Sequence, residues 1–573
     1  MVALILELFG DEWLLLPALQ YRWNCPGTEH KVRNSKIICL CLLVAFGAVA
    51  RATTTEPASD DARPNILLIV ADDLAYADLG SYGSDIATPN IDALAAEGLL
   101  FTQFHTAPMC APTRAMLLSG NNNHVAGMAR QGVSGILGYE HPAYENHLSD
   151  RVIPFPRLLR EAAYHTYMAG KWHLGVAPEH SPQAAGFERS FSNLHGAGSH
   201  FDAVGFEEGG TLYREDGEFV EWPRHRYSTD LYTEKLIRFI GENQGDGRPF
   251  FAFAAYTSPH WPLQVPDEYL DRYAGRYNAG YDRLREQRFE SLKKAGIIPQ
   301  ASTLPPRNDA IRPWEDLDTE EQRIEARKME LYAAMVDNLD DHVGRLIDYL
   351  KANDLYDNTL IIFMADNGAA AEDFYNQEPY MEYVREHYDN AYGNMGRASS
   401  FVSYGPQWAE AGSAPFQRHK GYTREGGITA PMIISGPGVA ARAEKTSAYL
   451  TVMDLAPTFL ELAGVEYPAG GSVQSMRGES INAFLAGTSD AVHDENYLTV
   501  LSHKGRALVR QGKWKLSNLE YPFDEAEFEL FDLDSDPGET NDRAGSEPEK
   551  YQELLELWRT ERGKLGIVLP QDL

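Results

Sequence analysis

Three uninterrupted apolar runs constrain the fold of this chain more than any other feature. They cover residues 65–71, 250–256 and 360–365. Runs of this length without alternation are typical of strands that are buried on both faces, as in parallel α/β sheets. The first run stops at Asp72-Asp73 and the last at Asp366-Asn367. Because ligands bind beyond the carboxyl ends of such strands, we expect these polar groups to meet at one edge of a sheet.

Helical patterns lie between the apolar runs. Thr88-Pro89 begins a helical body that reaches Glu97, and Gly98 closes it. Residues 319–351 form a long helical stretch with an apolar stripe that is expected to face the core. The stripe comprises Tyr332, Met335, Leu339, Val343, Leu346 and Leu350. Strands that alternate with helices predict an α/β class, here a large, mostly parallel sheet flanked by helices.

The sequence pattern changes near residue 490. Short alternating runs separated by turns follow, and a last helical stretch covers residues 548–564. The runs are 497–501, 506–510, 513–516 and 528–532. This pattern predicts a small antiparallel sheet closed by a helix. We therefore expect a large domain of residues 64–490 and a smaller C-terminal α+β domain of residues 491–573.

The N-terminal region has the pattern of an export signal. A basic stretch precedes the apolar residues 37–50, and a small-residue cleavage pattern ends at Ala52. The apolar run is too short to span a bilayer as a helix, so no membrane anchor is expected. We expect residues 1–52 to be an N-terminal extension and signal peptide and residues 53–63 to be a linker. The protein is then periplasmic or secreted.

The charge and the cysteine usage limit the possible partners. The formal net charge is −32 at pH 7, which argues against nucleic-acid and anionic-membrane partners. A site for an anionic substrate must be locally positive against this field. Beyond residue 52 the chain has a single cysteine, Cys110, and therefore no partner for a disulfide. Cys110 is a packing residue, a reactive thiol or the precursor of another group.

The two polar pairs at the strand ends supply oxygen ligands. Asp72, Asp73, Asp366 and Asn367 carry carboxylate or amide oxygens. Clustered carboxylates repel one another unless a positive charge lies between them. Oxygen ligands suit a hard cation, Ca²⁺ or Mg²⁺, rather than zinc. Solvated strand ends are the simpler explanation of a single pair, whereas two pairs that each follow an apolar run leave a metal site and a solvated edge equally open.

Basic and imidazole groups occur in three further motifs. Lys171 and His173 are two residues apart in Gly-Lys-Trp-His, and an extended chain would point both to one face. His260 follows the second apolar run in a Pro-rich turn, and His419-Lys420 precedes a Gly-rich turn. Each motif taken singly also fits a surface charge or a structural histidine.

The motif around Cys110 resembles the signature of the type I sulfatases. Cys110-x-Pro112-x-Arg114 is followed by Leu-Leu-Ser119-Gly120. The other motifs occur in the order of that family. They are Asp72-Asp73, Lys171-Trp-His173, Ser-Pro-His260, Asp366-Asn367-Gly, Lys420-Gly, Asp454-Leu-Ala-Pro-Thr and the late segment from Leu530 to Asn541. The resemblance extends from about Pro64 to the C-terminus and is strongest to the bacterial arylsulfatase branch of the alkaline phosphatase superfamily.

This resemblance implies a modified nucleophile. Cys110 is oxidised to formylglycine (3-oxoalanine) by a formylglycine-generating maturation enzyme. The hydrated aldehyde is a geminal diol, in which one hydroxyl attacks sulfur and the other later expels sulfate, so one difficult step is divided into two. The implied fold is alkaline-phosphatase-like, and residues 64–490 become the catalytic sulfatase domain.

The resemblance also implies a role for each site residue. One Ca²⁺ ion is held by Asp72, Asp73, Asp366, Asn367 and the modified Cys110. Arg114 and Lys171 hold the hydrate, and Lys171 and Lys420 bind the sulfate oxygens. His260 protonates or hydrogen-bonds the leaving alcohol, and His173 takes the proton from the second hydroxyl.

The expected function is hydrolysis of a sulfate monoester, either an aryl or an alkyl sulfate, in which the substrate is a small molecule or a glycan. One alternative is a phosphonate monoester or phosphodiester hydrolase of the same superfamily. Another is a non-catalytic protein that binds sulfated glycans. We expect residues 193–202, residues 369–413 and the aromatics near Trp261 and Trp408 to form the specificity rim. Residues 369–413 fit a lid or a disordered surface insertion.

Overall fold

The computed structural model describes residues 63–131, 142–440 and 442–569. These residues all belong to one compact unit of the chain. The predicted extension, signal peptide and most of the linker lie outside the described residues. In the described ranges, no helix combines the length and apolar character needed to cross a bilayer.

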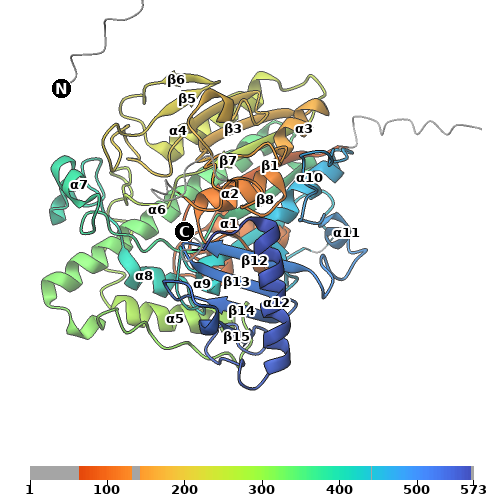
Figure 1. The fold of residues 1–573 in the computed structure, drawn as a ribbon. Helices are drawn as coiled ribbons and strands as arrows, with labels where there is room; N and C mark the ends of the chain where they lie inside the picture. Colours follow the sequence, from red (N-terminus) through yellow and green to blue (C-terminus); the bar gives the residue numbers. More distant parts are fainter. Residues whose placement is uncertain (1–62, 132–141, 441, 570–573) are drawn as a thin grey trace, which may run out of the picture. The chain divides into compact units, whose positions relative to one another are not determined.

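A large, mostly parallel sheet forms the centre of this unit (Figure 1). Its strand order is β10-β2-β9-β8-β1-β7-β3-β4-β5-β6, and β11 also pairs with β2. The strand β9 is antiparallel to both of its neighbours, whereas β8, β1, β7 and β3 are parallel. The strands are β1 (Asn65–Ala71), β2 (Leu99–His105), β3 (His165–Lys171), β4 (Arg189–Asn193), β5 (Tyr213–Glu215), β6 (Glu218–Val220), β7 (Phe250–Ala255), β8 (Thr359–Ala365), β9 (Thr429–Ser435), β10 (Glu444–Thr446) and β11 (Leu450–Thr451).

Helices cover both faces of the large sheet. They are α1 (Pro89–Glu97), α2 (Cys110–Ser119), α3 (Phe155–Glu161), α4 (Ser228–Glu242), α5 (Gly280–Lys294), α6 (Thr319–Ala352), α7 (Met381–His387), α8 (Gly405–Gly412), α9 (Glu425–Ile428), α10 (Leu455–Leu462) and α11 (Asn482–Leu485). Phe251 of β7 contacts Phe155 of α3 and Phe459 of α10. Phe250 points to the opposite face, where Tyr167 links it to Phe239 of α4. The predicted class of a mostly parallel sheet flanked by helices is therefore confirmed.

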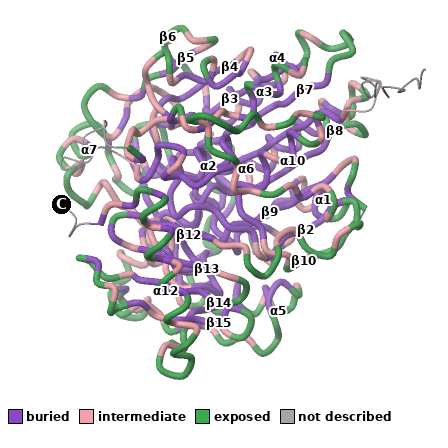
Figure 2. The backbone as a smooth tube through the Cα atoms, turned by 45° about the vertical axis from the view of Figure 1, so that its right-hand side comes forward, coloured by how far each residue is buried: buried purple, intermediate pink, exposed green. Residues whose placement is uncertain are grey.

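The apolar patterns of the sequence become the core. Every residue of β1, β7 and β8 is buried, and the buried backbone is concentrated along the strands in Figure 2. All six residues of the predicted stripe on α6 are at most 1% exposed. The helix begins with a capping box in which Asp318 accepts from the backbone of Glu321 and Glu321 accepts from that of Asp318.

A second, antiparallel sheet follows the large one in the chain. Its order is β12-β13-β14-β15. The elements are β12 (Leu498–His503), β13 (Arg506–Gln511), β14 (Trp514–Asn518), β15 (Glu529–Asp532) and α12 (Pro548–Leu565). Trp558 of α12 and Leu516 of β14 share a separate hydrophobic cluster. The predicted small sheet with a closing helix is confirmed, whereas the domain boundary near residue 490 stays a prediction.

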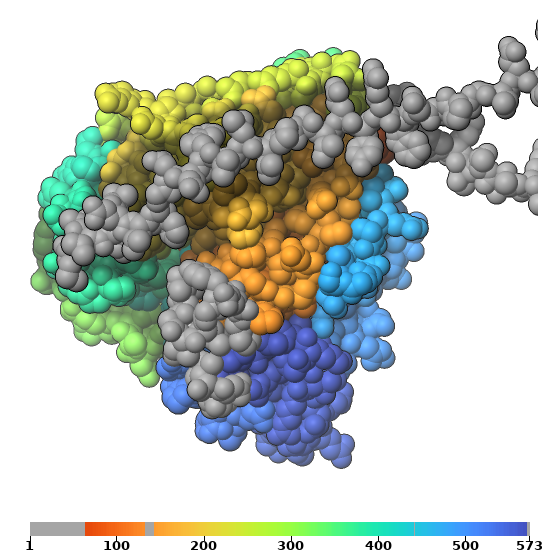
Figure 3. Space-filling model, turned by 45° about the horizontal axis from the view of Figure 1, so that its top comes forward, coloured from red at the N-terminus to blue at the C-terminus, as the bar shows by residue number. Residues whose placement is uncertain are grey.

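The small sheet packs against the segment that follows α2. Asn122 donates its side-chain amide to the carbonyl of Val500 in β12 at 2.8 Å. Val125 contacts the hydrophobic cluster of the small sheet. Figure 3 shows this blue C-terminal region in contact with orange atoms from the N-terminal part of the described chain. The small sheet therefore lies close to the helix that begins with Cys110.

Candidate active site

Four neighbouring parallel strands deliver functional side chains to one edge of the large sheet. Val70 of β1 is in register with Met364 of β8 and Ala255 of β7, and Ala255 is in register with Gly170 of β3, so the strands end at the same level. The side chains at this edge are Asp366 and Asn367 after β8, Asp72 and Asp73 after β1, His260 beyond β7 and Lys171 at the end of β3. Cys110 reaches them from α2. The structure thus brings the predicted strand-end residues together.

Cys110 is the first residue of α2, and its side chain is fully buried. Its Sγ lies 3.8 Å from Oδ1 of Asp73. Burial raises the pKa of the thiol well above its ordinary value, and the charges of Lys171 and Lys420 oppose this only in part. An unmodified thiol at this position is therefore protonated at neutral pH and is a weak nucleophile.

Potential metal ligands surround Cys110. The group consists of four residues that each offer one ligand atom, namely Asp72, Asp73, Cys110 and His260. These four atoms all lie within 4.8 Å of one another. Asn367 joins the cluster because its Nδ2 donates to Asp73 Oδ1 at 2.6 Å. These residues thus form a buried cluster of carboxylate, amide, sulfur and imidazole groups.

Two oxygens of this cluster have no hydrogen-bond partner. Asp72 Oδ1 and Asn367 Oδ1 are both buried and unpartnered within the described part of the chain. A buried polar atom without a partner costs about 1–3 kcal/mol. Carboxylate and amide oxygens are the ligands that hard divalent cations prefer. The cluster therefore fits a bound cation that would satisfy both oxygens.

Two buried lysines approach the carboxylates of the first strand end. Lys171 Nζ lies 2.6 Å from Asp72 Oδ2, and Lys420 Nζ lies 2.8 Å from Asp73 Oδ2. Burial alone would raise the pKa of Asp73, but the charges of Lys420, His260 and Lys171 outweigh burial and lower the pKa below its usual range. Asp73 is therefore a carboxylate at any pH near neutrality.

Arg114 holds the carboxylate of the other strand end. Its Nε and Nη2 donate to Asp366 Oδ2 at 3.2 and 2.9 Å, and its Nη1 donates to the carbonyl of Lys171 at 2.9 Å. Burial and the nearby Asp72 raise the pKa of Asp366, against the influence of Arg114. The three lysine and arginine charges formally cancel those of the three aspartates. A divalent cation would therefore make the site positive and able to hold an anion.

His173 reaches the site in a different way from the one expected. The strand β3 ends at Lys171, and His173 has a left-handed backbone with φ 60°, so strand alternation does not place it. A Cβ on Gly196 would lie 2.4 Å from Cε1 of the imidazole, which shows that this glycine makes room for the ring. Burial and the charge of Lys171 lower the pKa of His173 well below its ordinary value. The ring is therefore neutral, and its Nδ1 is buried without a partner among the described residues.

His260 is a neutral acceptor toward the site. Its Nδ1 lies 2.7 Å from the carbonyl of Trp261, and because a carbonyl only accepts, the proton is on Nδ1. The other nitrogen, Nε2, lies 3.3 Å from Lys420 Nζ and 3.2 Å from Asp73 Oδ2. Burial and the charge of Lys420 lower the pKa of His260 to about 3, although Asp73 opposes this. Nε2 therefore accepts a hydrogen bond from Lys420.

The structure brings part of the predicted specificity rim together, and its role in specificity stays a prediction. Trp261 packs in one apolar cluster with Ala197 from residues 193–202 and with Phe401 from residues 369–413. The latter stretch contains α7 and α8, and its role as a lid stays a prediction. Trp408 lies elsewhere: it is fully buried and donates to the carbonyl of Glu325 at 3.1 Å. It belongs to the core and cannot contact a substrate at the rim.

A buried ion network that the sequence does not reveal lies beside the Lys420 loop. Lys515 of β14 lies 2.7 Å from Glu425 Oε1 and 2.9 Å from Glu539 Oε1. Glu425 begins α9, five residues after Lys420, and its Oε2 lies 2.7 Å from His105 Nε2. The alternation of residues along the strand does not predict that Lys515 is buried, because the carboxylates that pair with it are distant in the chain. The network attaches the small sheet to the loop that carries Lys420.

Replacing Lys515 is expected to destabilise the fold strongly. Lys515→Met leaves Glu425 and Glu539 buried without their common cation, and breaking a buried pair in this way costs about 3–5 kcal/mol. The free energy of unfolding measured in urea should fall by that amount. Lys513→Met is the matched control, because Lys513 is exposed and pairs with one carboxylate, Asp532, so it should lower the unfolding midpoint much less than Lys515→Met does. Equal midpoints for the two variants would contradict this account of the network.

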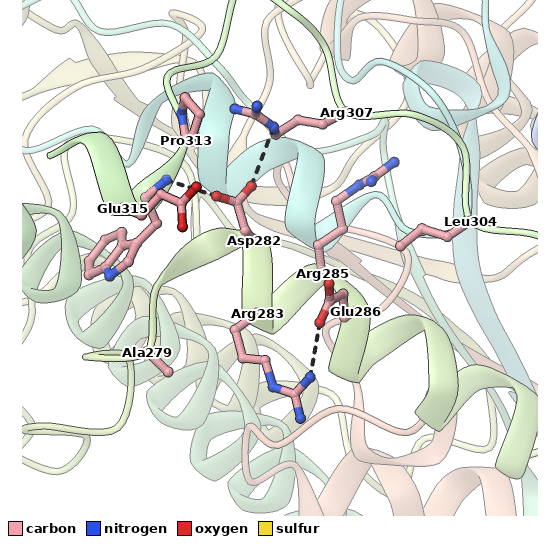
Figure 4. Close-up of a pocket in the computed structure, with 10 residues that line it drawn as sticks. Ala279, Asp282, Arg283, Arg285, Glu286, Leu304, Arg307, Pro313 and Glu315 are labelled. Carbon is pink, nitrogen blue, oxygen red and sulfur yellow. Dashed lines mark hydrogen bonds and ion pairs between the residues drawn. The ribbon is translucent and has the colours of Figure 1, made fainter.

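A separate surface pocket of about 540 Å³ lies on α5 (Figure 4). Two ion pairs lie in its lining. Arg283 bonds to Glu286 at 2.9 Å, and Arg307 lies 3.5 Å from Asp282. None of the strand-end residues lines it. The pocket therefore lacks the clustered groups around Cys110 and is not the candidate site.

Comparison with known proteins identifies the family. A family model described as "Sulfatase" matches residues 64–465, and one described as "N-sulphoglucosamine sulphohydrolase, C-terminal" matches residues 417–561. An uncharacterized sulfatase of Schizosaccharomyces pombe is 40% identical over 90% of this chain and 96% of its own length. An arylsulfatase of Klebsiella aerogenes is 40% identical over 76% of this chain and 92% of its own length.

A solved structure agrees with this assignment. Ps i-CgsB, crystallised in complex with k-i-k-neocarrahexaose, has a TM-score of 0.62 and 25% identity to this chain. The match covers 87% of this chain and 92% of that one. The family models, the relatives and the fold all indicate a sulfatase, and the charged residues clustered around Cys110 fit this assignment. The chain belongs to the sulfatase family, with the alkaline-phosphatase-like fold of that family, and is a sulfuric ester hydrolase.

Proposed function

We propose that the protein hydrolyses sulfate monoesters of aryl or alkyl alcohols, with a formylglycine at position 110 and one Ca²⁺ ion. The convergence of Arg114, Lys171 and Lys420 on the buried Cys110 carries this proposal. Formylglycine supplies, as its hydrate, two hydroxyls on one carbon, one to attack sulfur and one to release sulfate. The weak nucleophilicity of the buried thiol supports a modified residue. The proposal includes a formylglycine-generating maturation enzyme as a partner.

The chemistry of the donor set supports the calcium ion. The residues proposed to hold it are Asp72, Asp73, Asp366, Asn367 and the modified Cys110. When bound, such an ion polarises a sulfate oxygen and lowers the pKa of a hydroxyl ligand. The two unpartnered oxygens of Asp72 and Asn367 support this assignment, and the excess of oxygen ligands favours Ca²⁺ over zinc.

The basic residues of the site bind the sulfate group. Lys171 and Lys420 donate to the sulfate oxygens, where negative charge grows in the transition state. Bonds to Asp366 and to the carbonyl of Lys171 hold Arg114 in place, and its charge acts on the residue at position 110. All three cations are buried, so their charges are weakly screened by solvent and act strongly on the bound anion.

The two neutral imidazoles have complementary roles. His173 has a buried, unpartnered Nδ1 and takes the proton from the second hydroxyl as sulfate leaves. His260 protonates or hydrogen-bonds the oxygen of the leaving alcohol. Entry of an anionic substrate raises the pKa of His260, because a negative charge favours the imidazolium form.

We place the protein in the periplasm or outside the cell. The basic and apolar pattern before Ala52 supports this location. The acidic net charge supports a protein that binds neither nucleic acid nor an anionic membrane.

A comparison of substrates tests the proposed reaction. The matured protein is expected to have a kcat/KM for p-nitrophenyl sulfate at least about 100-fold above that for the bis(p-nitrophenyl) phosphodiester, because its charged groups are arranged around one sulfate monoester. A preference for the phosphodiester or for a phosphonate monoester would assign the chain to that alternative. Absence of turnover with all of them would overturn the proposal.

A further inference from the structure

A second group of basic side chains lies beside the Lys420 loop. It consists of Arg130, Arg418, Lys504 and Arg506, which we call the cationic rim. Lys504 lies in the turn between β12 and β13 of the small sheet, and Arg506 is the first residue of β13. Arg418 lies two residues before Lys420, and Arg130 follows α2 in the chain. The group thus draws on three distant segments.

Arg506 attaches the rim directly to the candidate active site. Its Nη1 donates to the carbonyl of Gly421 at 2.7 Å. Gly421 follows Lys420 in the chain, and its N–H donates to the carbonyl of Pro108, two residues before Cys110, at 2.7 Å. Arg506 therefore contacts the residue that directly follows the lysine that is proposed to bind sulfate.

Two guanidinium groups of the rim share one aromatic ring. The guanidinium carbon of Arg506 lies 3.9 Å from the centroid of the Tyr422 ring, and that of Arg418 lies 5.2 Å from it. Such stacking fixes the orientation of the two cations. The Nε of Arg506 is buried and has no partner among the described residues. A donor therefore remains available for an acceptor that this chain does not supply.

The charges of the rim act on one another. Lys504 is exposed, but desolvation by the surrounding protein lowers its pKa, and the charges of Arg130, Arg506 and Lys420 lower it further. Burial also lowers the pKa of Arg506, and the charge of Arg418 adds to this effect. Cations that disfavour one another's charged state in this way are stabilised by an anion placed between them.

The described residues provide little compensation for these charges. None of the four rim residues has a carboxylate within 4.0 Å in the described ranges, although the chain has 83 acidic and 51 basic residues. Glu372 is the acidic side chain whose charge acts on Lys504 and on Lys420, and it forms an ion pair with neither. Four cations against one carboxylate leave this face of the site positive.

We propose that the cationic rim binds a second anionic group of the substrate. The inference rests on the proposed function, which places the scissile sulfate at Lys171 and Lys420. The second group is a carboxylate or a further sulfate on the same molecule. The substrate class is therefore a sulfate ester that carries at least two negative charges, such as an acidic or multiply sulfated sugar.

A matched pair of substrates tests this proposal. The pair is m-(carboxymethyl)phenyl sulfate and its carboxamide, which differ in charge but hardly in size or leaving group. The matured enzyme is expected to have at least about 10-fold higher kcat/KM for the acid, as one charge-assisted hydrogen bond provides. The ratio of kcat/KM for the acid to that for the amide should fall about three- to tenfold in Lys504→Gln and in Arg418→Gln. Added salt should also lower this ratio. Similar ratios for the variants and the natural enzyme would overturn the proposal.

Lys513→Gln is the control variant, because Lys513 lies on the same small sheet but pairs with Asp532, and its ratio should equal that of the natural enzyme. Melting temperatures of all variants exclude unfolding as the cause of a change. m-Phenylene disulfate, compared with phenyl sulfate, reports whether a second sulfate replaces the carboxylate. Equal kcat/KM for acid and amide, together with equal values for disulfate and monosulfate, would also overturn the proposal.

A binding measurement separates this proposal from the proposed function. Calorimetric titration of Cys110→Ala protein with m-phenylene disulfate and phenyl sulfate needs no turnover. The disulfate is expected to bind about 10-fold more tightly, and the added Lys504→Gln change should remove most of the difference. If no ester is hydrolysed but this preference is present, the proposed reaction fails and the rim stands. Equal affinities for the two probes would overturn the rim.

Discussion

Replacing Cys110 with serine is expected to abolish turnover. A serine has one hydroxyl, so it can accept sulfate at most once and has no second hydroxyl on the same carbon to release it. Loss of a nucleophile that acts together with its neighbours lowers kcat by several orders of magnitude, here about 10⁴-fold or more. Steady-state hydrolysis of p-nitrophenyl sulfate measures the loss, and a burst of at most one product per protein molecule would accompany it.

Thr113→Ser is the matched control for the Cys110 variant. Thr113 lies one turn along α2, and its hydroxyl bonds to the backbone of Ala107. Serine keeps that hydroxyl, so activity should remain within a few-fold of the natural protein. Near-normal turnover by Cys110→Ser would contradict the proposed chemistry, because a plain alcohol would then be sufficient.

Removing divalent cations is expected to have the second largest effect. Chelation leaves the buried oxygens of Asp72 and Asn367 without a partner and removes a charge that stabilises the bound anion. Charge stabilisation by a metal is worth several kcal/mol, so kcat/KM should fall by about 10³-fold and recover when Ca²⁺ is restored.

A measurement without substrate distinguishes a resident ion from an accidental one. An ion present at 100 times its dissociation constant stabilises the fold by about 2.7 kcal/mol, so the melting temperature should fall on chelation and rise with Ca²⁺. Asn367→Ala removes one unpartnered oxygen and should shift this calcium response to higher concentration. A melting temperature that is insensitive to chelator would contradict the metal site.

The strands beside the site could be predicted almost to the residue. The apolar runs at 65–71, 250–256 and 360–365 correspond to β1, β7 and β8, because strands buried on both faces have continuous apolar sequences. The register of these parallel strands then places Asp72, Asp73, Asp366 and Asn367 at one edge. The core stripe of α6 followed from helical periodicity in the same way.

Features that depend on distant partners could not be predicted. His173 has a left-handed backbone and lies against Gly196, and the local sequence around His173 specifies neither feature. The burial of Lys515 requires Glu425 and Glu539, and the approach of Arg506 to Gly421 requires the small sheet to dock beside the site. Residue type and periodicity carry no information on such long-range contacts.

Mass spectrometry of the native protein tests the central claim most directly. The proteolytic fragment that spans Cys110, from protein produced together with a maturation enzyme, is predicted to show the mass loss that accompanies conversion of the thiol to an aldehyde. An aldehyde-specific reagent should label the same fragment at position 110. Finding only the free thiol, in protein that nevertheless hydrolyses sulfate esters, would contradict the account.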